Sequence, residues 1–257
     1  MPAAEVDANT AVRYRATLAY DGTAYQGFQR QAGDTPTIQA ALEKALLAVT
    51  GQPVTVIAAG RTDSGVHAVG QVIAFDVVWK HGDDDLLRAI NAVLPDDIAL
   101  QDLRQQAGFH PRYDAVARVY KYHLVQAPQR QPLERNRAWY VRGELNYEAM
   151  NAAAMQLLGE HDFASFGRPP KGENTVRLLM ESHWNRRRVL HGWEWTYTIE
   201  ANAFLQHMVR RIVGVLVEVG RGALTLDEFM ALFRARKLIS SIALAPPQGL
   251  VLEQVKY

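Results

Sequence analysis

The sequence predicts an α+β protein made of two related subdomains that share a mostly antiparallel sheet. Strand-like and helix-like segments interleave in both halves of the 257-residue chain, and the stretches between them have the lengths of hairpins and crossovers. No low-complexity linker separates the halves, so we expect them to pack as one body. With 48% hydrophobic residues, the chain can form one large core or two small ones.

The first half is expected to alternate strands with two helices. The strands are expected over residues 13–20, 53–59, 70–78 and 98–103, and the helices over 36–49 and 83–93. Asp21-Gly22 is a turn signal after the first strand. Thr35 and Pro36 are the residue types that prefer the N-cap and the first helical position. Asp83 begins an acidic run that favours a helix N-terminus.

The second half repeats this alternation without a clear sequence repeat. Strands are expected over residues 116–125, 176–185, 193–201 and 250–257, and helices over 145–158, 204–219 and 226–236. Gly159 is expected to end the first of these helices. The proline- and glycine-containing stretch 168–174 is predicted to be a mobile loop.

The two parts of the chain before and after residue 108 have net charges of opposite sign. The net charge is +1 overall, but residues 1–108 carry −5 and residues 109–257 carry +6. The stretch 109–142 alone has seven basic and two acidic residues, and aromatic residues lie among them: Tyr113, Tyr120, Tyr122, Trp139 and Tyr140. This mixture suits a nucleic-acid surface, but it also suits a solvated strand face whose aromatic residues belong to the core. We expect subdomains over 1–108 and 109–257.

Composition narrows the classes of protein that the chain can represent. There are no cysteines, which excludes disulfides, thiolate nucleophiles and cysteine zinc sites. Residues 1–10 are polar and unlike a signal peptide, and no apolar run is long enough to span a membrane. We therefore expect a cytoplasmic protein that does not bind membranes.

The run Gly60-Arg61-Thr62-Asp63-Ser64-Gly65-Val66-His67 lies between two predicted strands. Asp63 is therefore expected to be presented by a tight loop, where glycines allow a close approach of backbone to a ligand. Arg61 is close enough in sequence to hold the carboxylate ionised and oriented. The alternative is an Asx-turn in which Asp63 bonds only to its own loop.

Familiar catalytic motifs are absent from the sequence. It has no P-loop, no Gly-x-Gly-x-x-Gly after a strand, no Gly-x-Ser-x-Gly and no His-Glu-x-x-His. The zinc deaminase signature is impossible without cysteine. The candidate functional residues that remain are one loop aspartate and several arginines and tyrosines.

The loop and four further segments resemble the bacterial tRNA pseudouridine synthase A family. The Asp63 loop and the Gly70-Gln71-Val72 that follows it resemble the active-site loop of the family. The other segments are Tyr20-Asp21-Gly22-Thr23 with Tyr25-Gln26-Gly27-Phe28, Phe109-His110-Pro111-Arg112 with Ala117-Arg118-Val119-Tyr120-Lys121-Tyr122, Ala201-Asn202-Ala203-Phe204 with His207-Met208-Val209-Arg210, and Ala245-Pro246 with Gly249-Leu250. The likeness spans about residues 14–257. Ser64 departs from it, because the family usually has alanine there.

The resemblance implies the pseudouridine synthase fold, with an active-site cleft between the two subdomains. It implies conversion of uridine to pseudouridine at positions 38, 39 and/or 40 of the tRNA anticodon stem-loop, with Asp63 as the nucleophile. It also implies that the enzyme needs no metal and no organic cofactor, and that it is a homodimer that binds one tRNA arm across both subunits.

The same resemblance assigns substrate-binding roles to three further residues. Tyr120 would pack on the uracil and help to remove the proton from C5; its alternative is an ordinary sheet aromatic. Arg210 would pair with Asp63; its alternative is a surface helix arginine. Arg61 would help to extrude the base or hold a phosphate; its alternative is a local salt bridge to Asp21 or Asp76.

Two other functions compete with the synthase. A non-catalytic RNA-binding protein with two RNA-recognition-like halves would need the basic, aromatic strand but not Asp63, although its usual aromatic signature is missing. A carboxylate-dependent glycosidase would need a second acid close to Asp63. The nearest acid downstream is Asp76, in an apolar predicted strand.

Overall fold

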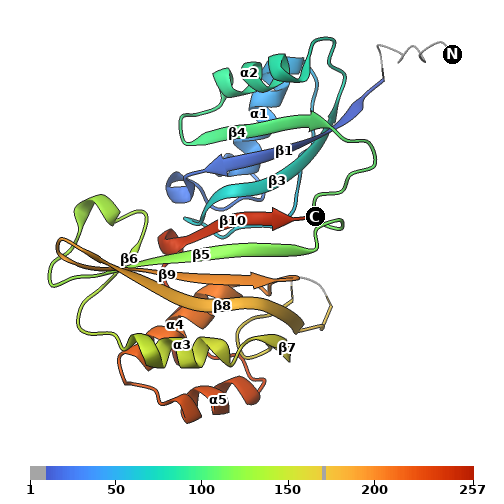
Figure 1. Cartoon of the computed structure of the whole chain (residues 1–257). Coiled ribbons are helices and arrows are strands. Elements are labelled where there is room, and N and C mark those ends of the chain that lie inside the picture. Colours follow the sequence, from blue (N-terminus) through green and yellow to red (C-terminus); the bar gives the residue numbers. More distant parts are fainter. Residues whose placement is uncertain (1–9, 170–171) are drawn as a thin grey trace. The chain divides into compact units, whose positions relative to one another are not determined.

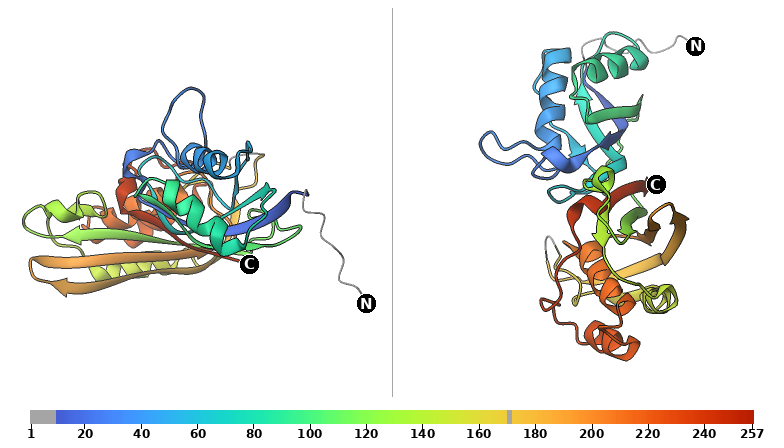
Figure 2. Two further views of the ribbon diagram at one scale, coloured as in Figure 1. Left: turned by 90° about the horizontal axis from the view of Figure 1, so that it is seen from above. Right: turned by 90° about the vertical axis from the view of Figure 1, so that its left-hand side faces the viewer.

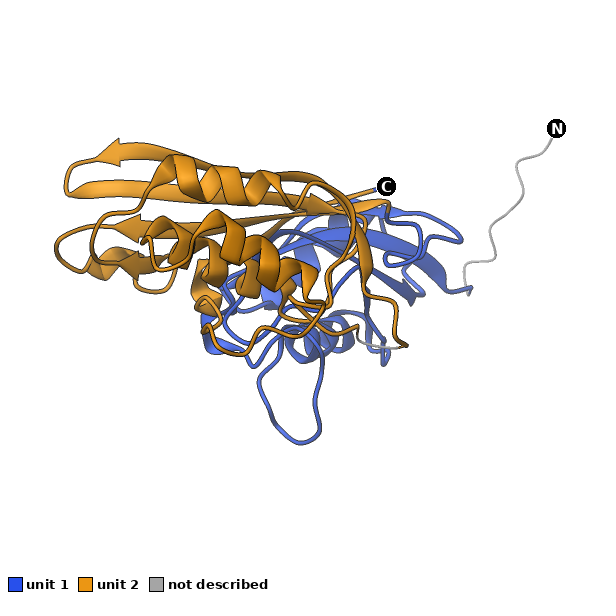
Figure 3. Cartoon of the chain, turned by 90° about the horizontal axis from the view of Figure 1, so that it is seen from below, with its two compact units in different colours: residues 1–115, 257 blue, residues 116–256 orange. Residues whose placement is uncertain are grey.

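The computed structural model of the chain describes residues 10–169 and 172–257, and these residues form two compact units (Figure 3). The first unit extends to Ala115 and also contains Tyr257, whereas the second comprises Val116–Lys256. Both units combine a mostly antiparallel sheet with α-helices, which confirms the predicted α+β class.

In the first unit, three antiparallel strands form the sheet in the order β4-β1-β3, and the short β2 pairs with β3 (Figure 1). The elements are β1 (Val12–Tyr20), a 3-10 turn (Gly22–Ala24), α1 (Ile38–Thr50), β2 (Ile57–Ala58), β3 (His67–Val77), α2 (Asp83–Val93) and β4 (Ile98–Gln105). Alternate residues of β1 are buried, as expected for a strand with one face in the core. Those residues are Tyr14, Ala16, Leu18 and Tyr20.

In the second unit, the sheet has the order β10-β5-β9-β8-β7, and the short β6 pairs in parallel with β5. Its strands are β5 (Ala117–Gln126), β6 (Trp139–Val141), β7 (Gly159–Asp162), β8 (Val176–Val189), β9 (Gly192–Ala201) and β10 (Leu250–Lys256). Its helices are α3 (Tyr147–Met155), α4 (Met208–Gly220) and α5 (Leu226–Arg234), with 3-10 turns at Pro132–Glu134 and Pro247–Gly249.

Helices α3, α4 and α5 lie on one side of the second sheet (Figures 1 and 2). Helix α4 is apolar over most of its circumference and is the most deeply buried of the three. Trp184, Trp195 and Tyr197 fill the sheet side of this core, and each is at most 1% exposed. Tyr122 and Leu124 of β5 pair with Tyr197 and Trp195, and both lie fully buried in this core.

The first helix begins two residues later than predicted, because Thr37 and not Thr35 is its N-cap. The Thr37 hydroxyl accepts a hydrogen bond from the Ala40 amide at 3.3 Å. The amides of Ile38 and Gln39 donate to the carbonyls of Gly27 and Phe28, so tertiary contacts satisfy the first helical donors.

The fourth predicted helix was placed from residue 204, but α4 begins only at Met208. The Gln206 amide donates to the Arg168 carbonyl at 2.9 Å, which holds this stretch in an extended bridge. His207, the N-cap of α4, is left-handed with φ of 60°, so the helix cannot continue through it. The segment after β9 is therefore a loop that carries Phe204.

Several other boundaries differ from the predictions. The strand predicted over 53–59 is reduced to β2, because the backbone of Val56 bonds to side chains of α1 instead of a strand. The strand predicted over 70–78 begins earlier, at His67, and the helix predicted over 145–158 covers only Tyr147–Met155. Strands β6 and β7 were not predicted. Residues 170 and 171 of the predicted loop 168–174 lie outside the described residues, as do residues 1–9 of the N-terminal stretch.

No helix in the described part of the chain is long and apolar enough to cross a membrane.

Candidate active site

Asp63 lies on a turn between β2 and β3, which confirms that a loop presents the carboxylate. The Val66 amide donates to the Asp63 carbonyl at 3.2 Å, and Gly65 has a φ of 75°, a conformation that favours glycine. Asp63 itself is half-buried. A backbone hydrogen bond and a left-handed glycine thus help to fix this turn.

The loop is fastened to the segment that follows β1. Thr62 is the main anchor: its hydroxyl bonds the Tyr20 hydroxyl at 2.8 Å, and its carbonyl accepts from the Phe28 amide at 3.1 Å. The Ser64 hydroxyl donates to the Tyr25 carbonyl at 3.1 Å, a bond that alanine could not make. The segment 20–28 and the Asp63 loop, which are far apart in sequence, therefore form one structural unit.

Two glycines allow this close approach. A Cβ atom on Gly22 would lie 2.1 Å from the Val66 carbonyl oxygen, and one on Gly27 would lie 2.8 Å from the Thr62 carbonyl oxygen. Gly27 also has a φ of 91°. Any side chain at Gly22 would push the loop away, so these glycines help to set the position of Asp63.

Arg61 does not hold the Asp63 carboxylate. It is exposed, and it forms no hydrogen bond or ion pair with any residue that the structure describes. Residues two apart in an extended loop need not direct their side chains to the same ligand. The predicted contact between these two side chains is therefore wrong.

The alternative, a local salt bridge from Arg61, is also not formed. Asp76 pairs with Arg13 through two hydrogen bonds of 2.6 Å, and these bonds lower the pKa of the Asp76 carboxyl. Asp21 accepts from the amide and the hydroxyl of Thr23. Arg61 is left as an exposed cation beside the Asp63 turn.

Tyr120 lies in the second unit, on β5 between Leu252 of β10 and Ile199 of β9. It is 9% exposed, and its ring meets the ring of Phe204 edge-on, with centroids 5.1 Å apart. Sequence reasoning did not predict this contact, because it placed Phe204 in a helix. The unusual conformation of His207, which frees Phe204 from the helix, has no signal in the sequence.

Arg210 lies in the first turn of α4 and is half-buried. Its guanidinium donates to the Ala245 carbonyl at 2.8 Å, and the Ala245 amide donates back to the Arg210 carbonyl at 3.1 Å. Nearby, the buried Tyr122 hydroxyl donates to the Pro246 carbonyl at 2.8 Å. Burial raises the pKa of Tyr122, and the charge of Arg210 opposes that rise. Arg210 therefore lies close to the face of β5 that carries Tyr120 and Tyr122.

The neighbouring Arg211 has a structural role. Its guanidinium donates to the carbonyls of Ile239 and Phe166 at 2.9 and 2.8 Å. Burial lowers its pKa, and the positive charges of Arg168 and Arg210 lower it further. Exposed Arg168 thus joins Arg210 in a positive region of the second unit, a feature that the sequence pattern did not indicate.

The structure thus places Asp63 and Arg61 on one loop of the first unit, and Tyr120 and Arg210 near one face of β5 in the second. Within the described residues, no group of three or more His, Asp or Glu side chains is arranged to hold a metal ion.

Comparison with known proteins gives consistent results. A family model described as tRNA pseudouridine synthase matches residues 16–114 and 153–257. A protein called tRNA pseudouridine synthase A from Neisseria gonorrhoeae is 42% identical over 252 residues, which cover 95% of this chain and 92% of the relative. Proteins of the same name from Methylacidiphilum infernorum and Chloroflexus aurantiacus are each 40% identical, over 96% and 93% of this chain and 96% and 87% of their own lengths.

Proposed function

The chain belongs to the tRNA pseudouridine synthase family, and we propose that it isomerises uridine to pseudouridine at positions 38, 39 and/or 40 of the anticodon stem-loop of tRNA, with Asp63 as the nucleophile. The observation that carries this proposal is the anchored Asp63 turn. Bonds from Tyr20, Phe28 and Tyr25 hold residues 62–65, so a half-buried carboxylate is presented at a defined position.

The proposed reaction rearranges the nucleoside without loss of atoms. The bond between N1 of uracil and C1′ of ribose breaks, the base turns, and a bond from C5 to C1′ forms; C5 loses a proton and N1 gains one. The Asp63 carboxylate adds covalently, either to the sugar or to the base, and leaves later, which divides one difficult step into easier ones. A base in a stacked arm must first be turned out to reach a side chain on a loop.

The other proposed roles follow the chemistry of each side chain. Tyr120 offers an aromatic face for the uracil and a hydroxyl for proton transfer at C5. Arg210 supplies the counter-charge of Asp63 in an active-site cleft. Arg61, an exposed cation two residues before Asp63, contacts a phosphate or the space left by the extruded base.

Incubation with an unmodified tRNA transcript tests the proposal against its rivals. The synthase forms pseudouridine and releases no uracil. A non-catalytic RNA-binding protein would bind the transcript and leave every uridine unchanged. A glycosidase would release free uracil, but its candidate second acid, Asp76, is already paired with Arg13. Mapping the modified positions by primer extension tests the assignment to 38–40.

Replacing Arg210 with alanine is expected to reduce both stability and turnover. The variant loses a charged hydrogen bond to the Ala245 carbonyl, worth about 1.5–3 kcal/mol, and leaves Asp63 without its proposed counter-charge. Arg211→Ala is the matched control, because it also removes a half-buried guanidinium that bonds to carbonyls. Thermal unfolding and single-turnover rates are measured for both. Equal losses of rate in the two variants would remove Arg210 from the active site.

Binding of tRNA is expected to weaken steeply with salt. Basic residues of 109–142 and 186–237 are proposed to meet phosphates. Among them, Arg186 and Arg188 are exposed, stack on Trp193 at 4.6 and 5.2 Å, and pair with no carboxylate among the described residues. If about five phosphates are neutralised, log K should fall against log salt with a slope of about −4. A slope near zero would mean that the basic half serves another purpose.

We further propose that the enzyme acts in the cytoplasm as a homodimer that binds one tRNA arm across both subunits. Sedimentation equilibrium tests the assembly: a monomer at micromolar concentration, with and without tRNA, would contradict it.

A further inference from the structure

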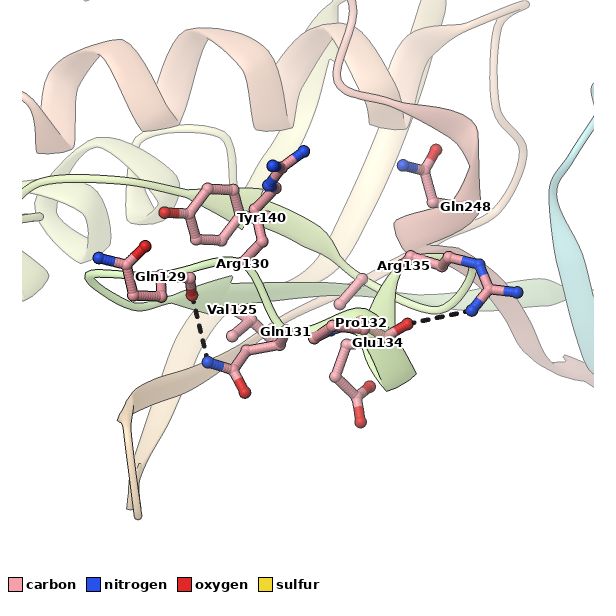
Figure 4. Close-up of a pocket in the computed structure, with 10 residues that line it drawn as sticks. Val125, Gln129, Arg130, Gln131, Pro132, Glu134, Arg135, Tyr140 and Gln248 are labelled. Atoms are coloured by element: carbon pink, nitrogen blue, oxygen red, sulfur yellow. Dashed lines mark hydrogen bonds between the residues drawn. The ribbon is translucent and has the colours of Figure 1, made fainter.

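A cavity of about 560 Å³ lies in the second unit, beside the connection between β5 and β6 (Figure 4). Two guanidinium groups border it, those of Arg130 and Arg135. Gln131, Gln248 and Tyr140 also line it, and the Gln131 amide donates to the Gln129 carbonyl at 3.1 Å. Cationic, amide and aromatic groups are thus gathered around one hollow.

Val125 and Ala138, which line the cavity, belong to a small packed apolar cluster. Val125, Ala127 and Ala138 are each 5% exposed and pack together, and Tyr140 packs against them. The Tyr140 hydroxyl donates to the Pro128 carbonyl at 3.2 Å, which holds the ring in place. A half-buried aromatic ring with its hydroxyl already engaged offers mainly its face to a ligand.

The two arginines are available for an anion. Both are exposed, and among the described residues neither forms a salt bridge; Arg135 donates only to the Pro132 carbonyl, at 3.3 Å. Glu134 also lines the cavity, so these three side chains carry a net charge of +1. A single phosphate between two guanidinium groups fits this balance better than a polyanion does.

This cavity is separate from the proposed place of the target uridine. Val125 follows Tyr120 by five residues on β5, so their side chains point to opposite faces of the sheet, about 17 Å apart along the strand. Residues 125–140 also fall between the two stretches that the family model matches. A ligand here is therefore not the uridine that packs on Tyr120.

We propose that this cavity binds one unpaired nucleotide of the tRNA outside the anticodon arm. Its base stacks on Tyr140, and its phosphate lies between Arg130 and Arg135. Stacking requires an open base face, which an unpaired nucleotide has and a base-paired one lacks. The identity of the RNA as tRNA rests on the proposed function, but the binding of a distant nucleotide does not depend on catalysis.

The test compares full-length tRNA with the isolated anticodon stem-loop by filter binding. The double variant Arg130→Ala/Arg135→Ala should bind full-length tRNA about tenfold more weakly, bind the stem-loop like the wild type, and keep the single-turnover rate at saturating tRNA. The control Arg88→Ala/Arg104→Ala removes the same charge from exposed positions of the first unit and should change neither affinity.

A second pair of variants tests the ring. Tyr140→Phe keeps the stacking face and should bind full-length tRNA normally, whereas Tyr140→Leu should bind about tenfold more weakly. Thermal unfolding by circular dichroism checks that each variant is folded. Unchanged affinity of the arginine double variant for full-length tRNA, or an equal loss with the stem-loop, overturns the proposal.

Two further outcomes are informative. If a nucleoside monophosphate binds the wild type but not the double variant, and tRNA affinity is unchanged, the cavity serves a free nucleotide and the proposal is wrong. Failure of the wild type to form pseudouridine would refute the proposed function, and the comparison of the two RNA affinities would still decide this inference.

Discussion

Replacing Asp63 with asparagine is expected to reduce pseudouridine formation by more than about a thousandfold, which corresponds to about 4 kcal/mol of lost transition-state stabilisation. The amide keeps the shape of the side chain but is a poor nucleophile. Folding and tRNA affinity should change little, because the turn is held by Thr62, Ser64 and the Asp63 carbonyl. Asparagine is also well tolerated in turns. The experiment measures the single-turnover rate at saturating tRNA and the affinity for tRNA.

Asp76→Asn is the matched control. It removes the other candidate carboxylate of the first unit and the ion pair with Arg13, so it should cost some stability. It should leave the rate of isomerisation within about tenfold of the wild type, a change of less than about 1.4 kcal/mol in the barrier. Comparable rates for Asp63→Asn and the wild type would remove Asp63 from the nucleophile role. A large loss of rate in Asp76→Asn would favour the glycosidase alternative, which needs two carboxylates.

The Asp63 loop could be predicted from sequence because its signals are local. Two glycines and two strand-like flanks specify a turn, whatever the rest of the protein does. What holds the loop could not be predicted, because Thr62 meets Tyr20 and Phe28 across more than 30 residues of chain. The supposed contact of Arg61 with Asp63 failed for a related reason: closeness in sequence does not decide where an exposed side chain points.

The order of strands and helices was likewise predictable, since alternation and helical spacing are properties of single segments. The residue at which each helix begins could not be predicted in the same way. Thr35 and Thr37 are equally good N-caps by residue type, and the carbonyls of Gly27 and Phe28 select the second. Strand β6 is only three residues long and owes its pairing to β5, so no periodicity marks it.

The start of α4 has the greatest consequence for the site. Apolar spacing continues from Phe204 into the helix, so the pattern predicts one long helix. The bridge between Gln206 and Arg168 and the left-handed His207 interrupt it. Phe204 is thereby free to pack edge-on against Tyr120. The surroundings of Tyr120 are thus set by a backbone conformation that residue types alone do not encode.

Substitutions of Tyr120 are expected to separate its ring from its hydroxyl. Tyr120→Phe keeps the stacking face and the contact with Phe204, so it should bind tRNA nearly normally. If the hydroxyl serves proton transfer at C5, this variant should turn over about 10²–10⁴-fold more slowly. Tyr120→Leu loses the ring as well, and it should also lose about 1–3 kcal/mol of binding, the usual worth of one base–aromatic stack.

Tyr122→Phe is the control for these measurements. Tyr122 points to the same face of β5, but it is fully buried and its hydroxyl is engaged by the Pro246 carbonyl. Removing that hydroxyl should cost about 0.5–1.5 kcal/mol of stability and leave the single-turnover rate nearly unchanged. A slow Tyr120→Phe beside a normal Tyr122→Phe would assign the chemistry to one hydroxyl on this strand. If both Tyr120 variants match the wild type in rate and affinity, Tyr120 is a core residue of the sheet, and another side chain must hold the uracil.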